Sequence, residues 1–156
     1  MQPDSESLPA RDLVQACILA GGRSQRMGRD KARLIVQGRP LVQLLAARLQ
    51  PHVAVVRLVA KPDSGLEALG IPVLHDVEAE RALVHGIRTA LLAPGPEWRF
   101  VLACDMPGVG AEILSALWQR AREAGAPGAC ARLPGRSEIE PLPSLWHAGL
   151  ARSMVP

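Results

Sequence analysis

The first strongly apolar run of this chain, residues 13–20, leads directly into a loop that is rich in glycine and arginine. The loop reads Gly21-Gly22-Arg23-Ser24-Gln25-Arg26-Met27-Gly28-Arg29-Asp30-Lys31. The apolar run is typical of a buried strand. Glycines let backbone N–H groups approach a phosphate closely, and the arginines and lysine offset its charge. The pattern predicts an α/β fold whose first strand ends in a cradle for a polyphosphate.

Two familiar phosphate-binding loops are excluded. A P-loop requires Gly-x4-Gly-Lys-Ser/Thr, and the chain contains no such run. A dinucleotide-binding loop requires Gly-x-Gly-x-x-Gly, a spacing that the adjacent Gly21 and Gly22 break. The loop therefore belongs to another class of nucleotide-binding protein.

Length and composition favour one globular domain. The 156 residues suit a single domain, and the 48% of apolar residues suffice for a core. The sequence contains no run of about 18 apolar residues, as a membrane-spanning helix would need. Residues 1–11 are polar and lack the apolar centre of a signal peptide. We expect a short disordered leader over residues 1–11, a single domain over 12–156 and a cytoplasmic location.

Charge and cysteine usage exclude two further classes of function. The net charge is only +3, and the chain has no tyrosine and one phenylalanine, which argues against a nucleic-acid-binding surface. Cys17, Cys104 and Cys130 form no Cys-x-x-Cys pair, so they are expected as core residues and not as metal ligands or a redox pair. Of the 18 cationic residues only Lys31 and Lys61 are lysine, and Lys31 stands in the glycine-rich loop; two lysines are too few to exclude chance.

Strand and helix signals alternate along the chain. Strands are expected over residues 13–20, 53–60, 71–74, 98–104 and, more weakly, 128–133. Helices are expected over residues 41–49, 80–92 and 111–124, with a short one from Asp63 or Ser64 to Leu69. This order predicts a three-layer α/β fold with a mostly parallel sheet. Ligands of such sheets bind beyond the carboxyl ends of the strands, so the glycine-rich loop, Asp76 and Asp105 are expected along one edge.

Two aspartates follow predicted strands. Asp105 comes directly after Val101-Leu102-Ala103-Cys104, and a carboxylate held there suits Mg²⁺, which takes one or two carboxylates together with phosphate oxygens. The alternative is that Asp105 caps a helix that begins near Gly108. Asp76 follows His75, where a simple turn is an equally good interpretation.

These stretches resemble the molybdenum cofactor guanylyltransferase family, whose members are MobA-like nucleotidyltransferases. Residues Leu19 to Lys31 match its signature LAGGxSxRMGxDK at every fixed position, and the run from Cys104 to Pro107 matches its second signature. A third segment, Pro141-Leu142-Pro143-Ser144-Leu145-Trp146, is similar to the family's PLPALY, on the side that receives the second substrate. A proline-bounded edge strand is the alternative there. The resemblance covers roughly residues 16–150.

The resemblance implies a Rossmann-like nucleotidyltransferase fold and the transfer of GMP from GTP to molybdopterin, with Mg²⁺ as cofactor and pyrophosphate as second product. It implies no membrane or nucleic-acid partner, and transient contact with molybdoenzymes or other proteins of cofactor biosynthesis. Arg26 and Lys31 would hold the phosphates, and Asp105 would bind the metal and complete the catalytic set. The nucleotide-binding residues that it implies are Leu19, Ala20, Gly21, Gly22, Arg26, Lys31, Asp76 and Asp105.

The chain departs from the family pattern in three places. After Asp76 the family shows Gly-Pro-Leu-x-Gly-Ile, and this chain reads Ala82-Leu83-Val84-His85-Gly86-Ile87 without the Gly-Pro. Its lone His85 invites a catalytic role, although a histidine on a helix is more often structural or solvent-facing. Val59 or Ala60 stands where many members have an asparagine near the base, so base contacts there would come from the backbone. Family members commonly continue past the position of Pro156, so this is a short member or a truncated domain.

The guanine assignment rests on one residue of the family signature. Cytidylyltransferases of the same type resemble this chain but read Ala-Ala-Gly where it reads Ala20-Gly21-Gly22. The alternatives are a cytidylyltransferase, a nucleotidyltransferase for another sugar or cofactor phosphate, and a non-catalytic nucleotide-binding relative.

Overall fold

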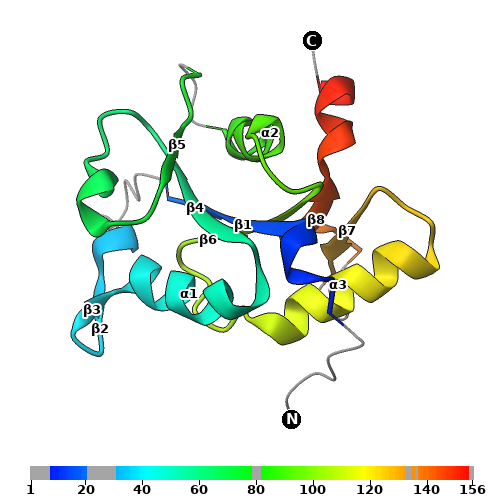
Figure 1. Ribbon diagram of the computed structural model, residues 1–156, viewed down its shortest axis with the longest axis horizontal. Helices are drawn as coiled ribbons and strands as arrows, with labels where there is room; N and C mark the ends of the chain where they lie inside the picture. Colours follow the sequence, from blue (N-terminus) through cyan, green and yellow to red (C-terminus); the bar gives the residue numbers. More distant parts are fainter. Residues whose placement is uncertain (1–7, 21–30, 79–81, 133–134, 136, 155–156) are drawn as a thin grey trace.

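The fold is a six-stranded sheet between two layers of helices (Figure 1). The computed structural model describes residues 8–20, 31–78, 82–132, 135 and 137–154. Four strands are parallel neighbours, in the order β5 (Val73–His75), β4 (Val55–Ala60), β1 (Val14–Leu19) and β6 (Trp98–Ala103). β8 (Glu140–His147) follows β6 and runs antiparallel to it and to β7 (Gly128–Ala131). The expected mostly parallel α/β sheet is confirmed.

The helices divide into two layers that bury separate cores. α1 (Leu41–Leu49) and α3 (Ala111–Glu123) cover one face of the sheet, and α2 (Leu83–Leu92) and the 3₁₀ helix η5 (Ala148–Met154) cover the other (Figure 1). Successive side chains of a strand point to opposite faces. In β1, Ala16 and Ile18 therefore pack toward α1 and α3, and Cys17 packs toward α2. A strand buried on both faces is almost entirely apolar, which explains the apolar run; Gln15, also fully buried, is the polar exception within β1. No helix in the described part of the chain has the length and apolar character to span a membrane.

The predicted elements are present with shifted ends. The short helix expected up to Leu69 is the 3₁₀ helix η4 (Leu66–Leu69), preceded by Gly65 in the left-handed region. Ser64 still contributes there, since its hydroxyl accepts a hydrogen bond from the Leu66 N–H at 3.3 Å. α2 begins at Leu83, and residues 79–81 at the expected start of this helix lie outside the described residues.

The proline-rich segment forms an interior strand, so the edge-strand alternative is wrong. β8 lies between β6 and β7. Its pairing with β6 begins only at Ser144 and runs to His147. Pro141 and Pro143, which have no N–H to donate, precede that ladder. Two prolines are tolerated in an interior strand because they lie between Glu140 and Ser144, where the ladder with β7 is irregular and the ladder with β6 has not begun.

A hairpin that the sequence pattern did not predict precedes α1. β2 (Ile35–Val36) pairs with β3 (Arg39–Pro40). The turn residues Gln37 and Gly38 both have positive φ, 51° and 77°. This is the backbone of a type I′ turn, for which glycine is suited at the second position. Strands of two residues carry too little periodicity to be recognised, and Gly38 was the available signal.

The predicted disordered leader is wrong for residues 8–11. Leu8 packs against the core beneath α1 and α3. Arg11, at the start of the 3₁₀ helix η1 (Arg11–Leu13), donates a hydrogen bond to the Val53 carbonyl at 2.8 Å. These contacts fix the approach to β1. Residues 1–7 lie outside the described residues.

A buried arginine donates hydrogen bonds to carbonyl groups at the carboxyl end of α2. Arg99, on β6, is 2% exposed. Its guanidinium donates to the carbonyls of Ala90 at 2.9 Å, of Ala93 at 2.6 Å and of Pro96. The last carbonyls of a helix have no partner within the helix, and Arg99 supplies donors for them. Burial lowers the pKa of Arg99, and its three acceptors compensate for the lost water.

Arg99→Met should lower the free energy of unfolding by about 2–4 kcal/mol, because buried carbonyls would lose charged donors. Urea unfolding followed by tryptophan fluorescence measures this change. Arg120→Met on α3 is the control, since Arg120 and Glu123 are 3.6 Å apart and both exposed. The control should change the free energy by no more than about 0.5 kcal/mol. Equal effects of the two substitutions would contradict the role given to Arg99.

Candidate functional site

The carboxyl ends of the four parallel strands form one edge, as expected. The chain passes from β1 to β4 on one side and later to β6 on the other, so the direction of strand order reverses between β1 and β6. Ligands of open α/β sheets bind at such a switch point. The carboxyl ends of β1 and β6 therefore flank the favoured ligand position. Gly21, Gly22 and Arg26 belong to the first loop and lie outside the described residues.

Lys31 and Asp105 meet at this switch point. The Lys31 Nζ lies 2.6 Å from Asp105 Oδ2, although 74 positions separate the two residues. Both side chains are about two-fifths exposed, at 41% and 43%. The hydrogen bond and the charge of Asp105 raise the pKa of Lys31, so the ammonium stays charged at neutral pH. An exposed pair of this kind can exchange partners: Lys31 can turn to a phosphate and Asp105 to a cation.

Lys31 is presented by a short, well-anchored 3₁₀ helix, η2 (Lys31–Arg33). Ala32 is fully buried in the core beneath α1. Arg33 donates through Nη2 to the carbonyls of Ser64 at 3.0 Å and Gly65 at 2.8 Å. Both anchors directly follow Lys31, whose own side chain remains open to solvent.

Asp105 is held by the end of the sheet and not by a helix. The Cys104 N–H donates to the Leu19 carbonyl at 3.1 Å, which continues the pairing of β6 with β1 by one residue. α3 begins at Ala111, and its preceding residue Gly110 makes no side-chain cap. The helix-capping alternative for Asp105 is therefore wrong. Its carboxylate stands at the sheet edge, where a ligand can reach it.

The donor set at Asp105 fits Mg²⁺ that arrives with phosphate. In the described part of the chain, no group of three or more His, Cys, Asp or Glu residues could hold a metal ion. Mg²⁺ is usually bound by one or two carboxylates plus substrate phosphates and water, and seldom by a full cage of protein ligands. The exposed Asp105 carboxylate, beside the Lys31 ammonium, matches that requirement.

Asp76 is buried, and its carboxylate accepts hydrogen bonds from other residues of the chain. It is 7% exposed. Its Oδ2 accepts a hydrogen bond from Lys61 Nζ at 2.9 Å, and its Oδ1 accepts one from the Glu78 N–H at 3.2 Å. The second bond is that of an Asx turn, so the turn interpretation of this aspartate is correct. A carboxylate has about four lone-pair sites, so these bonds leave capacity for a ligand.

Lys61 is the residue of this edge that the sequence interpretation left out. It follows β4 directly, and its side chain is 12% exposed. Besides Asp76 it binds the Glu78 carbonyl at 2.5 Å. Its place after a predicted strand and the scarcity of lysine in the chain were the signals that could have identified it.

Three other residues that the sequence analysis named at this edge, Ala20, Val59 and Ala60, are buried. The Ala20 N–H donates to the Val59 carbonyl at 2.8 Å. Val59 and Ala60 are 2% and 1% exposed, so their side chains belong to the core and offer nothing to a base. Gly86 on α2 lies against Leu19: an added Cβ would be 3.3 Å from Leu19 Cδ2. The glycine lets α2 approach the end of β1 closely.

The two ion pairs should differ in their effect on stability. Lys31→Ala should leave Tm within about 2 °C of wild type, because exposed pairs contribute little. Asp76→Ala should lower the free energy of unfolding by about 3 kcal/mol, because it leaves the Lys61 ammonium without its carboxylate in a largely buried place. Thermal and urea unfolding measure both effects. Comparable losses in the two variants would contradict the assigned burial.

The sequence of this chain is similar to that of known nucleotidyltransferases. Residues 16–155 match the model of the MobA-like NTP transferase domain. Molybdenum cofactor guanylyltransferases of Yersinia pseudotuberculosis serotype O:1b (strain IP 31758) and Yersinia pestis (strain Pestoides F) are each 34% identical over 114 residues. The match covers 71% of this chain and 58% of those relatives, so it spans somewhat more than half of their length.

Solved structures share the fold. Molybdopterin-guanine dinucleotide biosynthesis protein A of Archaeoglobus fulgidus has a TM-score of 0.72 at 22% identity, over 88% of this chain and 69% of its own. A protein of Aquifex aeolicus VF5 has a TM-score of 0.69 at 26% identity, over 89% and 72%. CMP:2-keto-3-deoxy-manno-octonic acid synthetase, solved with CTP, has a TM-score of 0.65 at 15% identity, over 92% and 78%.

Proposed function

Because the chain belongs to the MobA-like NTP transferase family, we propose that it transfers GMP from GTP to molybdopterin. The observation that carries this proposal is the 2.6 Å pair of Lys31 and Asp105 at the switch point of the sheet. In this proposal the Lys31 ammonium binds phosphate and the adjacent Asp105 carboxylate binds Mg²⁺; Lys31 ends the stretch rich in glycine and arginine. The acceptor and the base are suggested by the names of the guanylyltransferases that are 34% identical to the chain.

The reaction exchanges one phosphate ester bond for another. An oxygen of the molybdopterin phosphate forms a bond to the α-phosphorus of GTP. The bond from the α-phosphorus to the bridging oxygen of the β-phosphate breaks, and pyrophosphate leaves with that electron pair. The attacking phosphate is already anionic, so no side chain has to remove a proton from it. The protein contributes positioning and charge stabilisation.

In this proposal, several side chains together stabilise the negative charge of the phosphates. Lys31 leaves Asp105 and donates to the phosphates, above all to the departing pyrophosphate. Asp105, once released from Lys31, would hold Mg²⁺. The ion, when bound, neutralises charge between the phosphate groups. Gly21, Gly22 and Arg26 would add backbone N–H groups and a second cation. Asp76 would contact the nucleoside through its remaining lone pairs.

A cytidylyltransferase is the second candidate. The structural neighbour that was solved with CTP shares the fold of this chain. Val59 and Ala60 present no side chain to a base, so the base must be read by backbone groups near Ala20–Gly22. A few hydrogen bonds from the backbone would then distinguish guanine from cytosine.

Release of pyrophosphate tests the proposed chemistry. The protein is incubated with molybdopterin and each of GTP, CTP, ATP and UTP, with and without Mg²⁺. Asp105→Asn should abolish the Mg²⁺-dependent turnover, since an amide lacks the charge that a hard cation requires. Lys31→Ala should reduce kcat by roughly 10²-fold, the usual loss when a charge-stabilising donor is removed. Arg120→Met, far from the edge, serves as control and should match wild type. Unchanged metal dependence in Asp105→Asn would contradict its role, and nucleotide binding without turnover would indicate a non-catalytic relative.

Calorimetric titration with GTP, CTP and ATP in Mg²⁺ tests the base. GTP should bind at least about tenfold more tightly, because each donor or acceptor left unpaired by a wrong base costs about 1–3 kcal/mol. Preference for CTP would replace the guanylyltransferase with the cytidylyltransferase. Equal affinity for the three nucleotides would remove the basis for either assignment.

A further inference from the structure

Both lysines of this arginine-rich chain lie at the same sheet edge, and each is paired with a strand-end aspartate. Lys31 binds Asp105 at 2.6 Å, and Lys61 binds Asp76 at 2.9 Å. The environments differ. The first pair is 41% and 43% exposed, and the second is 12% and 9% exposed. An exposed pair can release its partners to a ligand, whereas a buried pair fixes the groups around it.

Lys61 is the centre of a hydrogen-bonded network that joins two strand ends. Its ammonium binds the Asp76 carboxylate after β5 and the Glu78 carbonyl two residues further on, at 2.5 Å. The Glu78 N–H binds back to Asp76 at 3.2 Å. These bonds hold the ends of β4 and β5 and residues 76–78 in one arrangement. An ammonium with three donors on a compact head suits two such acceptors.

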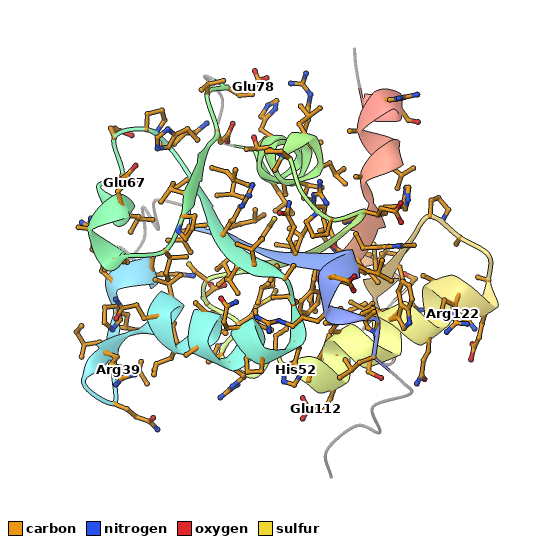
Figure 2. The ribbon with its side chains drawn as sticks, in the orientation of Figure 1. Arg39, His52, Glu67, Glu78, Glu112 and Arg122 are labelled. Atoms are coloured by element: carbon orange, nitrogen blue, oxygen red, sulfur yellow. The ribbon has the colours of Figure 1, made fainter. Side chains whose placement is uncertain are left out.

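The network continues to α2. The Glu78 carboxylate lies 2.6 Å from Arg88 Nη1, on the middle of that helix. Figure 2 shows Glu78 at the end of β5, on the side of α2. The backbone of α2 at Gly86 packs against Leu19, and Leu19 leads into the glycine-rich loop. Lys61 is therefore connected through α2 to the start of the phosphate-binding segment.

We propose that Lys61 is a positioning residue of the nucleotide site. Its ammonium holds Asp76 and, through Glu78 and Arg88, sets α2 against Leu19, so that the nucleoside side of the site is formed before the nucleotide arrives. A buried ion pair adds little net stability compared with apolar residues of similar size. We attribute the presence of the Lys61–Asp76 pair to the arrangement of the strand ends and α2 that it maintains. The inference rests on the proposed function, because it takes a nucleoside triphosphate as the ligand.

Lys61→Met is the direct test, with Arg57→Met as the matched control. Arg57 lies on β4 itself, four residues before Lys61, and donates to the Pro94 carbonyl at 3.0 Å. GTP and Mg²⁺ are titrated into each protein well below its Tm. Lys61→Met should weaken GTP binding by about tenfold or more, since small displacements of a binding group are costly. Arg57→Met should bind GTP as wild type does.

The folded state is monitored independently of the site. Trp98 and Trp118 pack edge to face, with ring centroids 5.3 Å apart, at the amino end of β6. That end is about 20 Å from the carboxyl edge, at roughly 3.3 Å per residue of strand. Unchanged tryptophan emission in Lys61→Met would show that the far end is intact. Lower Tm with unchanged affinity for GTP would give Lys61 a structural role only and would overturn the inference.

Two further variants keep the test decisive if Lys61→Met does not fold. Lys61→Arg keeps the charge and should bind GTP within about threefold of wild type. Arg88→Met cuts the network at α2 and should weaken binding about threefold or more. Wild-type affinity in Arg88→Met would overturn the inference while the proposed function stands. Failure of the wild-type protein to bind GTP, CTP or ATP would overturn both.

Discussion

The site depends on the parallel pairing of β1 with β6. In that register Leu19 lies opposite Ala103, so both strands end at the same level. The Cys104 N–H extends the ladder to the Leu19 carbonyl at 3.1 Å. The segments that follow β1 and β6 therefore start next to each other, at the point where the strand order reverses. Without this register, the loop that carries Lys31 and the turn that carries Asp105 would have no common position.

Solvent exposure separates two ion pairs of the same chemistry. Lys31 and Asp105 keep about two-fifths of their side chains in water, where an ion pair is weak and its partners exchange readily. Lys61 and Asp76 are largely removed from water, where loss of one partner leaves a costly charge. The edge thus combines one labile pair at the switch point with one fixed pair behind it. Toward the opposite end of the sheet, Arg99 secures the carboxyl end of α2 through the carbonyl groups of Ala90 and Ala93.

The sequence predicted those features that consecutive residues encode. The apolar run of residues 13–20 specified a strand buried on both faces, whereas phosphate binding by the glycine-rich loop stays a prediction. The placement of Asp105 and Asp76 after strands put both at the carboxyl edge, since parallel strands share their polarity. The order of elements was sufficient for the α/β class. Its errors were local: the two-residue strands around Gly38 lacked periodicity, and the described part of the leader owes its order to the contact of Arg11 with Val53, 42 residues away.

Only the tertiary structure decided which groups meet. The partner of Asp105 stands 74 residues before it, and nothing in either local pattern selects Lys31 over another cation. The pairing of Lys61 with Asp76, the interior position of β8 and the contact of Gly86 with Leu19 likewise follow from strand order and helix packing. Local sequence determines how a segment folds and which chemical groups it carries. Burial and partner choice arise when segments distant in sequence pack together, because only then is water excluded and each charge given its neighbours.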